Sequence, residues 1–119
     1  MTSNANETVN IYRGNVTSVY DADSITLELR LGFGIVLENF KLRLARIDAP
    51  EIRGSSRELG IIGRDALRTL ILNKEVEILF IKKGKYGRHI CEVMLEINNQ
   101  FINISDWLLD NNFADEYTY

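Results

Sequence analysis

The stretch Ser24-Ile25-Thr26-Leu27-Glu28-Leu29-Arg30-Leu31 alternates polar and apolar side chains along its whole length. A period of two residues places the apolar side chains on one face, which is typical of a half-buried β-strand. Residues 12–20, just upstream, are rich in β-branched and aromatic side chains and predict a preceding strand, with Gly14 as a bulge. Residues 20–23 then provide the turn between the two strands.

Downstream, Gly32-Phe33-Gly34 is typical of a hairpin connection. Three further strands are predicted, over about residues 36–47, from Val76 to Phe80 and from His89 to Ile97. An exposed loop is expected over residues 52–58, and it precedes a helix. That helix is predicted by apolar residues at helical spacing, namely Ile62, Ala66, Leu67, Leu70 and Ile71, with Asn73 as its stop.

A short second helix is predicted near the end of the chain, with Ser105 as its N-cap and Asn111 or Asn112 as its stop. Five strands, with one helix after the third and another after the fifth, is the order expected of a small barrel of the OB type. The predicted fold class is therefore a five-stranded β-barrel (OB-fold) with two helices, an α+β single domain. Residues 1–10 are expected to form a flexible tail and residues 11–119 the domain.

The overall charge counts against a protein that grips nucleic acid through broad electrostatics, because the net charge is −3 and the pI is near 5.2. The charge is unevenly placed, however. Basic residues gather from Lys41 to Arg68 and from Lys82 to Arg88, whereas acidic residues gather near the end of the chain. This distribution predicts a basic working face opposite an acidic back.

No membrane partner is expected, since no apolar run approaches the roughly 20 residues that span a bilayer. Met1 to Asn10 lacks the pattern of a secretory signal, which suggests a cytoplasmic protein or a processed secreted form. The single cysteine, Cys91, shares a strand face with Val93 and is expected to be a buried thiol.

Two aspartates stand at predicted strand ends, Asp23 and Asp48, and such ends converge at the rim of a small barrel. Two carboxylates there could share one cation, and oxygen ligands favour calcium or magnesium. No cluster of His and Cys with zinc spacing exists in the sequence. Taken alone, an acidic residue at a turn is more simply a turn former.

Three further side chains suit phosphodiester chemistry. Pro50 would hold Glu51 in a set relation to Asp48, which makes Glu51 a candidate general base for an attacking water. Arg43 and Arg88 could neutralise the charge that develops on phosphorus. For each residue singly, a loop glutamate or a surface ion pair is the simpler interpretation.

Four segments together resemble the thermonuclease, or staphylococcal nuclease, family: Asp21-Ala22-Asp23-Ser24, residues 43–51, Lys85-Tyr86-Gly87-Arg88 and residues 105–114. They occur in the family's order and with similar spacings, from about Tyr12 to the end of the chain. Ala22 stands where the family usually has glycine, and Ser24 where it usually has threonine.

The resemblance implies a calcium-dependent endonuclease that hydrolyses DNA and RNA without sequence specificity and leaves 3′-phosphate ends, with magnesium as the less suited metal. The substrates would be single-stranded or frayed, and the protein would be a monomer. Carried over by position, the site residues would be Asp23, Asp48 and the Ala49 carbonyl as metal ligands, Asp21 just behind them, Arg43, Glu51 and Arg88 as catalytic residues, and Lys85, Tyr86 and Tyr117 as substrate-binding residues.

The alternative is a catalytically silent nuclease-like module that binds nucleic acid or protein. The acidic net charge motivates it, because this charge weakens the electrostatic case for a nuclease. Such modules typically lack the catalytic arginines or glutamate, whereas this chain has them. Binding to single strands without turnover in any divalent metal would distinguish the two functions.

Overall fold

A computed structural model of the chain describes residues 11–52 and 54–118. The elements are β1 (Ile11–Asp21), β2 (Ser24–Gly32), β3 (Ile35–Leu44), β4 (Ile47–Asp48), the 3-10 turn η2 (Gly54–Ser56), α1 (Arg57–Ile71), β5 (Glu75–Lys83), the 3-10 turn η3 (Lys85–Gly87), β6 (His89–Ile97), β7 (Gln100–Asn103), α2 (Ile104–Asp110) and β8 (Asp115–Glu116). The predicted tail, residues 1–10, lies outside the described residues.

The described strands form a closed barrel. The main sheet has the order β3-β2-β1-β5-β6-β7, and β3 also pairs with β6 in parallel. This last pairing joins Leu42–Leu44 to His89–Cys91 and closes a ring of five strands, while β7 extends β6 as a hairpin. The predicted five-stranded OB-type barrel with two helices is therefore confirmed.

The core fills the barrel and continues under the two helices. Its strand residues come from the apolar positions of the alternating stretches, and Leu67, Ile71, Ile104 and Leu108 close it from the helices. Burial of these side chains is the dominant stabilising term for the barrel. Cys91 is buried as expected, and burial raises the pKa of its thiol to about 12.

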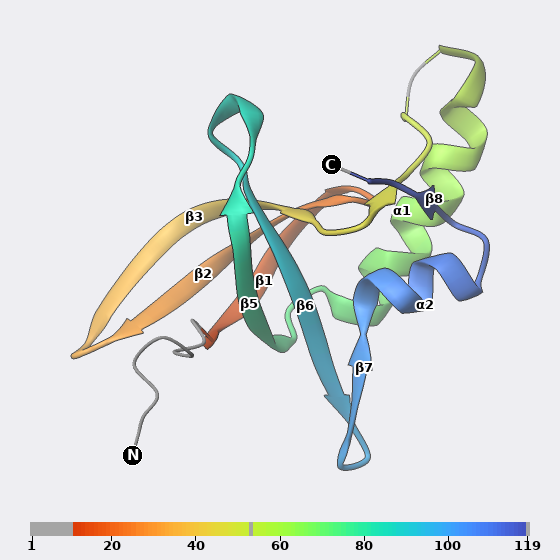
Figure 1. Cartoon of the computed structure of the whole chain (residues 1–119). Coiled ribbons are helices and arrows are strands. Elements are labelled where there is room, and N and C mark those ends of the chain that lie inside the picture. The colour runs from red at the N-terminus through yellow and green to blue at the C-terminus, as the bar shows by residue number, and fades with distance from the viewer. Residues whose placement is uncertain (1–10, 53, 119) are drawn as a thin grey trace.

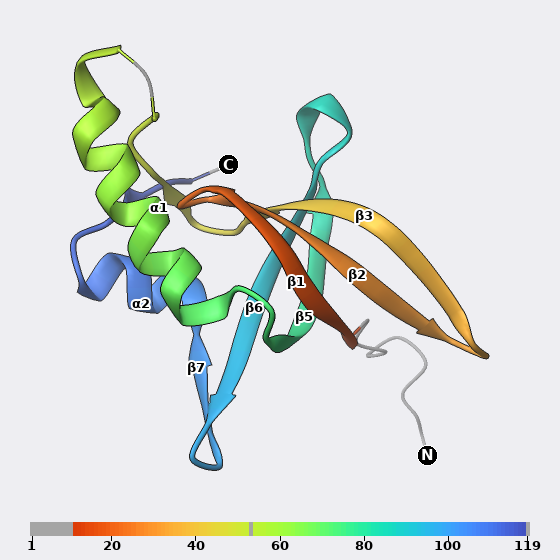
Figure 2. The ribbon, with the colours of Figure 1, turned by 180° about the vertical axis from the view of Figure 1, so that it is seen from behind.

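One end of the barrel collects segments that are far apart in the sequence. The β1–β2 turn, the β3–β4 connection, the β5–β6 turn and β8 lie at the same end, beside the start of α1 (Figures 1 and 2). The long β2–β3 hairpin and the β6–β7 turn extend the other way. The first end is the one that carries the predicted site residues.

Two expectations about the helices need correction. α1 begins at Arg57, inside the predicted loop, and Ile62 is exposed rather than buried. The first turns of α1 pack through Gly60 and Gly63, which leave no apolar signal in the sequence. Asn73 and Asn112 do adopt the positive φ expected of helix stops.

Ser105 is not the N-cap of the second helix. The cap is Asn103, whose side-chain oxygen accepts a hydrogen bond from the Asp106 amide at 3.0 Å. Ser105 lies fully buried in the first turn of α2. Either side chain is a good cap, and β7, which was not predicted, places the helix start two residues earlier.

Gly14 is not a bulge either. It is in regular register with Leu29 and Val76, and the irregularities in β1 lie between Val16 and Ser18 and between Val19 and Asp21. A Cβ atom at Gly14 would stand 2.5 Å from the Glu28 carbonyl oxygen. The glycine is needed for close strand approach.

Candidate active site

Asp23 lies in the turn between β1 and β2, and among the residues that the structure describes it is the only charged one that is buried. Its Oδ1 accepts a hydrogen bond from the Ser24 hydroxyl at 3.1 Å, and its Oδ2 accepts one from the Ala49 amide at 3.0 Å. The Leu44 amide donates to the backbone carbonyl of Asp23 at 2.8 Å. The turn is thus tied to both sides of the β3–β4 connection.

Arg43 joins Asp23 to Asp48. Its Nη2 lies 3.7 Å from Asp23 Oδ2 and 3.3 Å from Asp48 Oδ1. The side chain of Arg43 is 13% exposed and that of Asp48 is 61% exposed. Arg43 therefore lies at the buried bottom of the site, and Asp48 lies at its solvent-exposed side. Asp48 owes its position to the pairing of β4 with β8.

The pKa values of the two upstream aspartates are shifted in opposite directions. Burial raises the pKa of Asp21 to about 7, and the neighbouring Asp23 carboxylate adds to the rise. Burial also acts to raise the pKa of Asp23. The hydrogen bonds from Asp21 and the Ala49 amide, and the charge of Arg43, outweigh this effect and lower it. Asp23 is therefore the carboxylate held ionised.

Arg88 reaches the site from the connection between β5 and β6. It directly precedes β6, and its Nη1 donates to the Ser24 hydroxyl at 3.0 Å. Arg43 stands between Ser24 of β2 and Ile90 of β6 in the register of the barrel closure. The closure therefore brings the two guanidinium groups to the same mouth.

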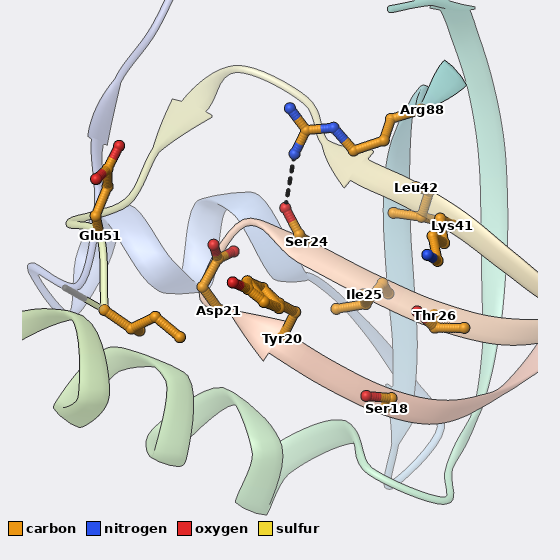
Figure 3. A pocket seen from close by; sticks show the side chains of 11 residues that line it. Ser18, Tyr20, Asp21, Ser24, Ile25, Thr26, Lys41, Leu42, Glu51 and Arg88 are labelled. Carbon is orange, nitrogen blue, oxygen red and sulfur yellow. Dashed lines mark hydrogen bonds between the residues drawn. The ribbon is translucent and has the colours of Figure 1, made fainter. Parts of the chain in front are cut away.

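Glu51 lies on the loop that leads to α1. Its carbonyl accepts a hydrogen bond from the Ser56 hydroxyl at 3.1 Å. Figure 3 shows Glu51 on one side of a hollow and Arg88 on the other, with Asp21 and Ser24 between them in this view. Glu51 therefore lies at the edge of the same hollow as Asp21, Ser24 and Arg88.

Two hollows open at this mouth. One, of about 540 Å³, is lined by residues that include Asp21, Ser24, Glu51 and Arg88. The other, of about 620 Å³, is lined by Arg43, Asp48, Lys82, Lys83, Gly84, Lys85, Tyr86, Arg88, Ile90 and Tyr117. All the residues predicted to bind substrate line this second hollow.

The Tyr117 ring is held over Arg43, with the guanidinium carbon 5.2 Å from the ring centroid. Its amide donates to the Arg46 carbonyl at 2.9 Å, which continues the β4–β8 pairing. That pairing also sets Asp115 opposite Asp48, so the predicted placement of the terminal acidic residues on a distant back is wrong for β8. The sequence did not predict β8, because a strand of two residues is too short to show a period.

The donor set fits a hard divalent cation. Arg43 Nη2 contacts both Asp23 and Asp48, which shows that the two carboxylates are close enough to share one positive charge. Within the described residues, no cluster of three or more His, Cys, Asp and Glu side chains forms a metal site. Carboxylates from Asp23 and Asp48 would hold the cation, with water completing the coordination.

Ala49 faces Asp23 through its amide. Its predicted role as a carbonyl ligand remains a prediction.

Sequence reasoning missed Ser24 as a link in this site. Its hydroxyl donates to Asp23 and accepts from Arg88, and so connects the expected metal ligand to the expected phosphate ligand. Its position next to Asp23 was the available signal. Lys82 and Lys83 were recognised as basic but not as lining residues of the site.

Comparison with known proteins supports the same interpretation. Residues 41–119, well over half of the chain, match the family model described as staphylococcal nuclease homologue. An uncharacterized protein of Methanocaldococcus jannaschii is 27% identical over 129 residues, a match that covers 89% of this chain and 59% of that relative. Asp21 and Asp23 precede the matched range, so their place in the site rests on the contacts described above.

Proposed function

Since this chain belongs to the family of staphylococcal nuclease homologues, we propose that it is a metal-dependent endonuclease that hydrolyses phosphodiester bonds of DNA and RNA without sequence specificity. The observation that carries the proposal is the contact of one guanidinium, Arg43, with both Asp23 and Asp48. Arg88 and Glu51 stand at the same mouth. The site therefore combines two arginines that would bind phosphate, a glutamate that would act as the base and two aspartates that would hold a cation.

The residues would divide the reaction as follows. Arg43 and Arg88 bind the oxygens of the scissile phosphate and stabilise the charge that develops there. Glu51 takes the proton of the attacking water. The bond from phosphorus to the 5′ oxygen breaks and this oxygen takes a proton from solvent, which leaves a 3′-phosphate on one fragment and a 5′-hydroxyl on the other. A calcium ion held by Asp23 and Asp48 would order the water and neutralise phosphate charge.

The proposed substrate is a single strand or a frayed end. At the second hollow, Tyr86 is 90% exposed and Tyr117 is 45% exposed. An aromatic ring of this kind stacks on a base only when that base is free of its neighbours, as in a single strand. Lys85, on the same turn as Tyr86, would contact a neighbouring phosphate. We further propose that the protein acts as a monomer. Among the described residues, no helix has the length and apolar character to cross a membrane.

Removal of the metal tests the proposal. Digestion of single-stranded DNA is expected to fall to background in EDTA and to return on addition of calcium. Magnesium should restore less activity, because it demands near-ideal octahedral geometry, whereas calcium accepts a flexible arrangement of oxygen ligands. Equal rates in EDTA and calcium would contradict a metal-dependent reaction.

A binding module without catalysis is the second candidate, favoured by the net charge of −3. Its expected result differs from that of the nuclease: single strands would be bound but not cleaved in calcium or magnesium. The same digestion experiment, run beside a binding measurement, separates the two functions.

The packing of α1 against the Glu51 loop gives a further prediction. A Cβ atom at Gly60 would lie 2.4 Å from the Glu51 carbonyl oxygen and 2.8 Å from that of Pro50. Gly60→Ala should therefore push this loop away and lower kcat by roughly 100-fold, as a displacement of about 1 Å can. The rate would be measured on single-stranded DNA, with thermal unfolding recorded in parallel.

Gly63→Ala is the matched control, because its Cβ would meet Ala22 and Phe113 at ordinary distances of 3.4 to 3.5 Å. It makes the same change on the same helix, one turn away. A folded Gly60→Ala variant that cleaves as fast as Gly63→Ala would show that this packing does not position Glu51.

A further inference from the structure

Arg88 lines both hollows at the mouth of the barrel, and among the described residues it is the one lining residue that the two share. The second hollow, with Lys85, Tyr86 and Tyr117, receives one side of the substrate in the function proposed above. The first hollow has no substrate contact assigned to it beyond the reacting group at Glu51. A strand held at Arg88 must continue past it in both directions if cleavage occurs within the chain.

The walls of the first hollow suit a nucleotide. Tyr20, on β1, is 49% exposed and lines it (Figure 3). Ser18 pairs with Thr26, and Thr26 pairs with Lys41, so three polar side chains lie in a row across β1, β2 and β3. All three line the same hollow.

Each of these groups matches one part of a nucleotide. An exposed tyrosine ring stacks on any unpaired base, which gives affinity without sequence preference. An exposed lysine binds a backbone phosphate and displaces a counterion. Hydroxyl groups such as those of Ser18 and Thr26 donate to phosphate or sugar oxygens. The volume of about 540 Å³ falls within the usual range of ligand pockets.

We propose that the hollow lined by Tyr20 and Lys41 binds the nucleotide of a single-stranded polynucleotide that lies across the scissile phosphate from the Lys85–Tyr86 turn. The base stacks on Tyr20 and the next phosphate contacts Lys41. This inference rests on the proposed nuclease function and deepens it, because it makes the site a track open at both ends. Such a track accepts a strand at internal positions.

The test measures binding of a fluorescently labelled thymidine octamer in EDTA by anisotropy, at several salt concentrations. Tyr20→Ala should weaken binding about fivefold or more, as loss of one stacked base does, and Tyr20→Phe should bind as the parent does. Lys41→Ala should weaken binding and reduce the slope of log K against log salt by about 0.7, the value for one phosphate contact on a single strand.

Lys74→Ala is the matched control, since Lys74 is also exposed but lies at the turn between α1 and β5, away from both hollows. It should leave affinity and salt slope unchanged. The inference is overturned if Tyr20→Ala and Lys41→Ala bind the octamer as Lys74→Ala does, or if the parent does not bind it at all.

Failure of the subsite and failure of the nuclease function give different results. A parent that cleaves in calcium while the Tyr20 and Lys41 variants bind normally excludes only the subsite. A parent that binds through Tyr20 and Lys41 but never cleaves supports the track and excludes the nuclease.

Discussion

Arg43→Ala is expected to lower kcat/KM on single-stranded DNA by about 1,000-fold, the loss typical of a guanidinium that stabilises a phosphoryl transition state. The side chain lies between Asp23 and Asp48 on the floor of the mouth, where it is 13% exposed. The guanidinium group would therefore stabilise the charge that develops on phosphorus in a partly desolvated environment, where electrostatic interactions are stronger than in water. The measurement is steady-state cleavage in saturating calcium.

Arg43→Lys should be measured as a second variant, because it keeps the positive charge and removes the planar guanidinium group. We expect it to recover little of the lost rate, since an ammonium group cannot bind two phosphate oxygens side by side. Arg13→Ala is the matched control: Arg13 pairs with Glu77 on the barrel wall, and its side chain is 63% exposed. Equal losses in the Arg13 and Arg43 variants would remove Arg43 from the reaction.

Glu51→Gln is expected to lower kcat by about 100- to 10,000-fold, the range that a positioned general base contributes. The substitution keeps the size of the side chain and removes only its ability to accept a proton. Binding of single strands should be unchanged or slightly stronger, because a negative charge leaves the mouth. The decisive measurement is kcat in saturating calcium, compared with octamer binding by the same variant.

Glu58→Gln serves as the control, since Glu58 is an exposed residue in the first turn of α1 on the same side of the molecule. Its cleavage rate should equal that of the parent. If the rate of Glu51→Gln is nearly that of the parent, another group takes the proton and the proposed role of Glu51 is wrong.

The barrel was predictable because its signal is local. Clean alternation over residues 24–31 and the glycines of the hairpin predict two strands, and the other strands of the barrel ring follow from period and composition, whereas β7 was not predicted. Asp23 and Asp48 could be expected at one mouth because each stands at a predicted strand end, and strand ends converge there. β8 carries no such signal, because a strand of two residues has no period.

What the sequence did not reveal depends on packing between distant segments. Gly60 matters because α1 approaches the Glu51 carbonyl, and this contact exists only after the helix docks. Ser18, Thr26 and Lys41 come together only through the register of three strands. The N-cap of α2 was misassigned because Asn103 and Ser105 are both good caps and only the unpredicted β7 decides between them.

The central claim is that Asp23, Asp48, Arg43, Arg88 and Glu51 act together as one hydrolytic centre. Its most direct test is cleavage of a defined single-stranded oligonucleotide, with the ends of the fragments identified by mass. We predict fragments that end in 3′-phosphate, formed in calcium by the parent and at least 100-fold more slowly by Arg43→Ala and Glu51→Gln. A folded parent that yields no fragments in calcium or magnesium, or variants that cleave as fast as the parent, would contradict it.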